Sequence, residues 1–385
     1  MSDSNFLILS CDGGGIRGLI TAMIIQQIDQ QTGFLDKVDL FAGTSTGGII
    51  ALALASGLPI SKIVGLYSNN CSQIFTPYIP PNSGDQDVQN DLNSIDNTLN
   101  SIDNFLQNDI PGILQGSSVV QGIESDVQSL ENDVNNAKNA LNDLNNLFYA
   151  KYDNTGLQSV LQSNLSNPAQ TLASLQRAVM VATFQLDNTS NSSWQPITLD
   201  NLKNNSINSQ NSKILDAALC TSAAPTFFPP YQHPTYGYCV DGGVFANNPS
   251  TLALSRVVKA GIANLEDIRM LSIGTGMNQY NISPSYQPAG SLRYGATTWL
   301  WPKAVGETPA VPLVQILMDS SSILDDSQAN MFLGDQQYQR MNIQLTGNIS
   351  LDDCSQISNM ESQVKKYLGE SEFSQAIDWI KTNFL

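Results

Sequence analysis

The sequence predicts an α/β fold, in which helices cover a mostly parallel β-sheet and a separate helical hairpin is inserted. Two observations support this prediction. Three short apolar runs each end in a glycine-rich turn, and they cover residues 6–10, 38–42 and 268–273. The segment 82–148 differs from the rest of the chain in composition and in apolar spacing. Strand, tight turn and helix in repetition are typical of parallel sheets, because the helix returns the chain to the start of the next strand.

Glycine and proline mark where the expected helices end. The helical pattern after the first run, Leu19–Gln31, stops at Gly33. The apolar helix after the second run stops at Gly57, with Pro59 just beyond. A glycine after the last turn followed by a proline is a common helix stop. We expect a further strand over residues 177–186.

Composition and charge narrow the class of protein. Hydrophobic residues make up 41% of the chain and charged residues 13%, which indicates a folded globular protein. No apolar run approaches the roughly 18–20 residues of a membrane span, and the N-terminus lacks the features of a signal peptide. We therefore expect a cytoplasmic protein, and leave open export without a cleaved signal. The net charge of −17 argues against nucleic acid as a partner and disfavours an anionic membrane surface.

The five cysteines are scattered through the chain and form no C-x-x-C pair. Neither a zinc site nor a disulfide framework is indicated by this spacing. An odd number of cysteines in a long chain fits free thiols in a reducing compartment.

Residues 82–148 have the pattern of two helices folded back on each other. In each half, 88–110 and 123–144, apolar residues recur at spacings of mostly three and four, which is typical of a coiled-coil seam. A break rich in Pro, Gly and Ser, Pro111–Ser118, separates the halves. The segment holds eleven acidic residues and a single lysine. We expect a solvated hairpin, and the alternative is an arm for a homo-oligomer or a protein partner.

The sequence Gly43-Thr44-Ser45-Thr46-Gly47 has the G-x-S-x-G form of a nucleophile elbow. It follows an expected strand and opens an expected helix, which is the context that this motif requires. Glycines are needed there because the turn is too sharp for a neighbouring Cβ. The helix N-terminus favours developing negative charge. Ser45 is therefore the candidate nucleophile.

A serine nucleophile needs a base, and two residues compete for this role. His233 is the single histidine of the chain, so a Ser-His-Asp triad is conceivable only through it. It lies in a proline-rich stretch, Pro229–Pro234, expected to be a loop. Asp241 lies in Asp241-Gly-Gly243, a turn that could direct a carboxylate into the cleft, although aspartate before glycine is often only a turn former.

A third element, Gly13-Gly14-Gly15-Ile16-Arg17-Gly18, lies between a strand and a helix. Unobstructed N–H groups in such a run can hold an oxyanion, and Arg17 could add positive charge. The same residues satisfy G-x-G-x-x-G, a dinucleotide-binding pattern. That alternative requires an acidic residue at the end of the next strand, where this chain instead has Ala42-Gly-Thr-Ser45. Nucleotide binding is therefore disfavoured.

Taken in order, Asp12–Gly18, Gly43–Gly47 and Asp241–Gly243 resemble the three signatures of patatin-like phospholipases. The resemblance covers nearly the whole chain except 82–148. It implies a single domain over 1–385 with 82–148 inserted, folded as a three-layer α/β/α sandwich. It also implies a catalytic dyad that needs no metal and no organic cofactor, and the single histidine agrees with a dyad. The implied site comprises the nucleophile Ser45, the base Asp241, the oxyanion-hole residues Gly13, Gly14 and Gly15, and the supporting residues Arg17, Gly43, Gly47, Gly242 and Gly243.

The resemblance implies a lipid acyl hydrolase of the phospholipase A type, which cleaves fatty-acyl esters of membrane lipids through an acyl-enzyme. Its partner would be a lipid substrate at a membrane or micelle surface, contacted peripherally. Two alternatives stay open. One is a scaffold or partner-binding protein that uses the hairpin 82–148, and the other is an acyltransferase on the same site.

Overall fold

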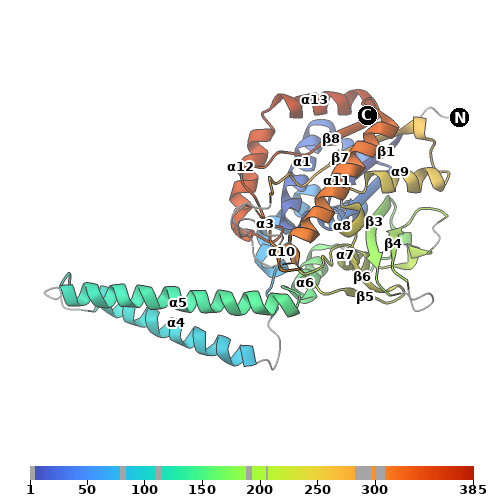
Figure 1. Ribbon diagram of the computed structural model, residues 1–385. Helices are drawn as coiled ribbons and strands as arrows, with labels where there is room; N and C mark the ends of the chain where they lie inside the picture. Colours follow the sequence, from blue (N-terminus) through green and yellow to red (C-terminus); the bar gives the residue numbers. More distant parts are fainter. Residues whose placement is uncertain are drawn as a thin grey trace, which may run out of the picture. The chain divides into compact units, whose positions relative to one another are not determined.

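The computed structural model describes residues 5–78, 84–109, 115–187, 193–204, 207–281, 296–300 and 308–385. Within these residues, one eight-stranded sheet organises the main part of the chain (Figure 1). Its strands are β1 Phe6–Cys11, β2 Leu40–Thr44, β3 Ala178–Gln185, β4 Gln195–Asp200, β5 Tyr231–His233, β6 Gly237–Asp241, β7 Ile268–Ile273 and β8 Tyr338–Met341.

The sheet is mostly parallel. Its order is β5-β6-β3-β2-β1-β7-β8, with β4 also paired to β3. The neighbouring strands β3, β2, β1, β7 and β8 are all parallel. At one side of the sheet, β4 and β6 pair antiparallel with β3, and β5 pairs antiparallel with β6. β1 lies in the middle, so the loop after its last residue is held between the ends of β2 and β7.

Helices cover both faces of the sheet and make three layers. Alternate residues of β1 point to opposite faces: Leu7 and Leu9 join one apolar core, and Ile8 joins the other. The larger core is built with α1 Gly18–Thr32, α2 Thr46–Ala55, α3 Ile60–Ile74, α6 Asn154–Asn164, α7 Ile214–Thr221, α12 Ile357–Tyr367 and α13 Ser371–Trp379. The smaller core is built with α9 Ser250–Lys259 and α11 Pro312–Leu333. The predicted three-layer α/β/α fold is confirmed.

Residues 77–151 form a compact unit of their own, which consists of α4 Gly84–Asn108 and α5 Ser118–Phe148. Five of their apolar side chains are buried together, Leu99, Leu106, Val120, Val127 and Val134. An ion pair of 2.9 Å joins Lys138 of α5 to Asp96 of α4. The two helices therefore pack on each other through one apolar row from each. The first half of the expected break between them, residues 111–114, lies outside the described residues.

The expectation of five free thiols is wrong. Cys71, in the last turn of α3, forms a disulfide with Cys354, and their Cα atoms are 5.7 Å apart. The other three cysteines are free and buried. The two partners are 283 residues apart in sequence, so spacing could not reveal them. The disulfide also removes the argument from free thiols to a reducing compartment, because disulfides persist mainly in oxidising ones.

None of the helices in the described ranges is long and apolar enough to cross a membrane.

Candidate active site

Ser45 lies in the turn between β2 and α2, with backbone angles φ 55° and ψ −125°. A positive φ is unusual for a residue with a Cβ and is held only when the surroundings enforce it. The Ser45 N–H donates to Thr221 Oγ1 at 2.9 Å, which is one such restraint. The side chain is largely buried, at the wall of an apolar cavity. A strand-to-helix turn with a residue of positive φ at its centre is the geometry that a nucleophile elbow requires.

The two glycines that flank the elbow are required by close approach of the backbone. A Cβ on Gly43 would lie 2.1 Å from the carbonyl oxygen of Gly47. A Cβ on Gly47 would lie 2.1 Å from the carbonyl oxygen of Cys11, at the end of β1. Both distances are far inside van der Waals contact, so any larger residue would open the turn.

Asp241 ends β6, and its carboxylate is buried. Oδ1 accepts a hydrogen bond from the Gly243 N–H at 2.7 Å, whereas Oδ2 has no partner within the described part of the chain. Burial raises the pKa of Asp241 to about 7, although the nearby Ser45 hydroxyl and the Gly243 N–H lower it in part. Gly242 is pressed against β3, since a Cβ there would lie 2.4 Å from the Ala182 carbonyl oxygen. The carboxylate is thus poised to take up a proton near neutral pH.

The predicted oxyanion glycines lie in the loop after β1 and differ in their hydrogen bonding. The Gly13 N–H already donates to the Asn247 carbonyl at 2.9 Å. Gly15 has φ +59°, and its Cβ position is filled by the Leu351 carbonyl, which also accepts the Ile16 N–H at 2.8 Å. No hydrogen-bond acceptor for the N–H groups of Gly14 and Gly15 is present among the described residues. These two donors remain available for an oxyanion.

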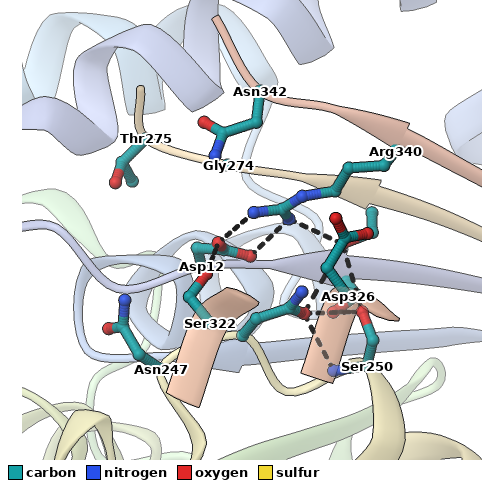
Figure 2. A network of polar contacts seen from close by, with 12 residues as sticks. Asp12, Asn247, Ser250, Gly274, Thr275, Ser322, Asp326, Arg340 and Asn342 are labelled. Carbon is teal, nitrogen blue, oxygen red and sulfur yellow. Dashed lines mark hydrogen bonds and ion pairs between the residues drawn. The ribbon is translucent and has the colours of Figure 1, made fainter. Parts of the chain in front are cut away.

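A buried polar network holds the residue that precedes this loop (Figure 2). The Asp12 carboxylate accepts two hydrogen bonds from Arg340 of β8, one of them 2.7 Å long from Nη1 to Oδ1. It also accepts one from the Ser322 hydroxyl of α11 at 2.9 Å. Arg340 Nη1 further donates to Ser272 of β7 at 2.8 Å. Strands β1, β7 and β8 and helix α11 are therefore tied together immediately before Gly13.

Arg17, the expected source of positive charge, has a different environment from Ser45. Its Nη1 donates to the Gly276 carbonyl at 3.1 Å, and its Nε has no partner among the described residues. Burial lowers the pKa of Arg17, and the nearby Tyr280 and Asp319 raise it. The side chain lines a polar cavity of about 250 Å³ next to Asp12 and Gly13, and is not part of the apolar cavity wall.

The cavity at Ser45 is almost entirely apolar. Besides Ser45 and Thr46, its wall includes Gly15, Met318 of α11 and Leu351. The aromatic and aliphatic part of the wall comes mainly from Ile49, Leu66, Tyr67, Phe75, Phe227 and Phe228. Such a lining excludes water and suits a hydrocarbon chain.

His233 does not lie where a base for Ser45 is needed. It ends β5 in register with Gly237, and Asp241 is four residues further along β6, about 13 Å at 3.3 Å per residue. Its Nδ1 accepts from the backbone N–H groups of Thr235, at 3.0 Å, and Tyr236, at 3.3 Å. Burial lowers the pKa of His233, which favours the neutral ring. The expected loop is thus a short edge strand, and its histidine closes a turn.

The family model of patatin-like phospholipases matches residues 9–254, which is more than half of the chain and contains all three motifs. The chain belongs to the patatin-like phospholipase family. It is accordingly a lipid acyl hydrolase, and the predicted membership is confirmed.

Curated relatives support the assignment over longer stretches. The chain is 25% identical to patatin-like protein 1 of Arabidopsis thaliana, over 96% of this chain and 82% of that protein. It is 26% identical to a cGAMP-activated phospholipase of Vibrio cholerae, over 72% of this chain and 66% of that one. Among solved structures, VipD from Legionella pneumophila aligns with 95% of this chain and 67% of its own at 17% identity and a TM-score of 0.40, too low to carry an argument.

Sequence reasoning missed the residues that hold the site from a distance. Arg340 lies outside every motif, and nothing in the sequence links it to Asp12. Leu351 contacts the loop after β1 through its backbone carbonyl, so the identity of its side chain does not reveal this contact. Asn247 holds Gly13 through its backbone carbonyl, so the identity of its side chain does not reveal the contact.

Proposed function

We propose that the family's lipid-ester hydrolysis is carried out in this chain by a Ser45–Asp241 dyad through an acyl-enzyme, with phospholipase A1 or A2 specificity. The observation that carries the proposal is the buried Asp241 carboxylate. It has one oxygen without a hydrogen-bond partner in the described part of the chain, and its pKa of about 7 depends in part on the Ser45 hydroxyl. Such a group ionises near neutral pH and has a proton to collect from Ser45.

The steps follow from this arrangement. Asp241 accepts the Ser45 proton while Oγ attacks the ester carbonyl carbon, whose acyl chain occupies the apolar cavity. The N–H groups of Gly14 and Gly15 stabilise the oxyanion. The protonated Asp241 then donates to the leaving alcohol or lysolipid. Water, deprotonated by the same carboxylate, releases the fatty acid and restores the serine.

Covalent labelling tests the nucleophile directly. A fluorophosphonate probe should attach to Ser45, as located by mass spectrometry of the peptide, and Ser45→Ala should abolish labelling and fatty-acid release together. The matched control is Ser222→Ala, because Ser222 lines the same cavity and its hydroxyl donates to the Ala218 carbonyl. Fatty-acid release that survives in Ser45→Ala would contradict the proposal.

A further inference from the structure

The exposed face of α11 is unusually apolar. Leu313, Ile316, Leu317, Leu324 and Met331 are 40%, 45%, 45%, 57% and 77% exposed. Most neighbours in this set are three, four or seven residues apart along one side of the helix, which places them in one row. We call these five residues the α11 stripe. Two further exposed apolar side chains flank it, Ile323 and Phe332. The exposed Ser320 and Ser327 lie on the same face, so the row is mainly apolar and uncharged. Exposed apolar side chains gathered on one face in this way mark an interaction site.

The opposite face of α11 belongs to the active site. Met318 lines the apolar cavity at Ser45 and lies against the turn at Gly243. Ser321 accepts a hydrogen bond from the Asn247 N–H at 3.2 Å, and Ser322 donates to Asp12. The helix is therefore a wall between the site and the solvent, about 10 Å thick with its side chains.

The stripe carries no charge. α11 contains no lysine or arginine, and its three acidic residues, Asp319, Asp325 and Asp326, each accept a hydrogen bond from another side chain. Asp319 accepts from Gln315, Asp325 from Thr251 and Asp326 from the Tyr338 hydroxyl. The chain as a whole has a charge of −17, so an uncharged face is where a lipid surface meets the least repulsion.

We infer that the α11 stripe is the surface by which this enzyme docks on an uncharged or zwitterionic lipid interface. The inference rests on the proposed function, because an enzyme that hydrolyses lipid at Ser45 must take lipid into the apolar cavity behind α11. Leucine, isoleucine and methionine side chains would insert among the acyl chains, and the polar flanks of the helix would stay at the head-group level. Docking places the cavity one helix diameter from the lipid it must take up.

Vesicle flotation tests the stripe separately from catalysis. In a Ser45→Ala background, which leaves the lipid intact, L317S/L324S should reduce binding to phosphatidylcholine vesicles on the order of tenfold, since about half of each leucine is open to solvent. The matched control is V258S/L265S, because Val258 and Leu265 are 43% and 40% exposed and lie in α9 and in the turn 265–267, outside the α11 stripe. This control should bind as the parent does. Equal binding by parent and stripe variant would overturn the inference.

Activity on two substrates gives the second readout. With Ser45 present, L317S/L324S should hydrolyse phosphatidylcholine vesicles about tenfold more slowly but a dissolved short-chain ester within twofold of the parent, because neither leucine lines the cavity. An equal loss on both substrates would assign the leucines to folding and overturn the inference. Loss of all hydrolysis in the parent would instead contradict the proposed function, and the flotation result would still stand.

Two further measurements exclude other occupants. Binding should fall as phosphatidylglycerol replaces phosphatidylcholine, and a rise would contradict an uncharged docking face. Light scattering without lipid should show the same mass for the parent and L317S/L324S. A dimer that only the parent forms would assign the stripe to a second copy of the chain and overturn the inference.

Discussion

The glycine loop after β1 lies between two regions whose buried carboxylates, Asp241 and Asp12, are paired to different extents. On one side, the cavity at Ser45 is apolar, and three of the polar groups close to the elbow have no hydrogen-bond partner among the residues that the structure describes. These are Asp241 Oδ2 and the N–H groups of Gly14 and Gly15, within the described part of the chain. On the other side, the Asp12 carboxylate accepts hydrogen bonds from Arg340 and Ser322.

This difference distinguishes groups that take part in the reaction from groups that hold the fold around the site. A buried polar group without a partner costs free energy, and is kept where a substrate or a proton supplies the partner during the reaction. A buried ion pair contributes little net stability, but removing one partner is severe, because the other charge remains buried. Changes on the Ser45 side should therefore alter rate with little change in stability, and changes on the Asp12 side should alter both.

The largest effect is expected from Asp241→Asn. The amide keeps an oxygen for the Gly243 N–H but cannot take a proton from Ser45, so kcat/KM should fall about 10⁴-fold, with thermal stability retained. Steady-state hydrolysis measures kcat/KM, and a melting curve measures thermal stability. The control Asp216→Asn keeps an acceptor for the Tyr231 hydroxyl and should act within twofold of the parent. A loss below tenfold in Asp241→Asn would reject Asp241 as the base.

Arg340→Gln should cost about 3–5 kcal/mol of unfolding free energy, because it leaves Asp12 buried without its cation. Urea unfolding measures this. The matched control is Arg256→Gln, which breaks the buried Arg256–Asp200 pair, and these two residues line neither the apolar nor the polar cavity. Both variants should lose stability, but only Arg340→Gln should also lower kcat at a temperature where both are folded. If Arg340→Gln and Arg256→Gln have the same kcat, the Asp12 network does not position the active site.

The pH profile should follow Asp241. Its pKa of about 7 means that the ionised base is lost as pH falls below that value, so kcat/KM should drop about tenfold per pH unit there. The sign for stability is opposite: a carboxyl group with a raised pKa stabilises the fold below its unfolded pKa near 4, and this contribution is lost as pH rises through about 7. A rate independent of pH between 5 and about 8 would contradict this assignment of the base.

The smallest effect on rate is expected from His233→Ala. The ring stacks on Tyr236 at 4.6 Å and caps a turn, so its loss should destabilise the fold by about 1–3 kcal/mol. The value of kcat/KM should stay within twofold of the parent at a temperature where the variant is folded. A large loss of rate there would restore a triad and reject the dyad.

Local sequence was enough to predict the features that depend on a few neighbouring residues. The glycines around Ser45 and in the loop after β1 impose turn conformations that other residues cannot adopt, so the turns were predictable from residue type. The short apolar runs before these turns predicted strands, and the three-and-four spacing in 82–148 predicted one apolar row on each helix. Three such motifs in order led to the family and its three-layer fold.

The tertiary structure alone decided what depends on packing between distant segments. No spacing rule links Arg340 to Asp12, Cys354 to Cys71 or the Asn247 carbonyl to Gly13, because each contact arises only when the sheet order brings its elements together. The same holds for α11, which is apolar on both sides: the sequence cannot say which side is buried, and packing against the active site leaves the α11 stripe facing solvent. A turn depends on a few neighbouring residues and can be predicted from sequence. A contact between distant segments depends on how the whole chain folds.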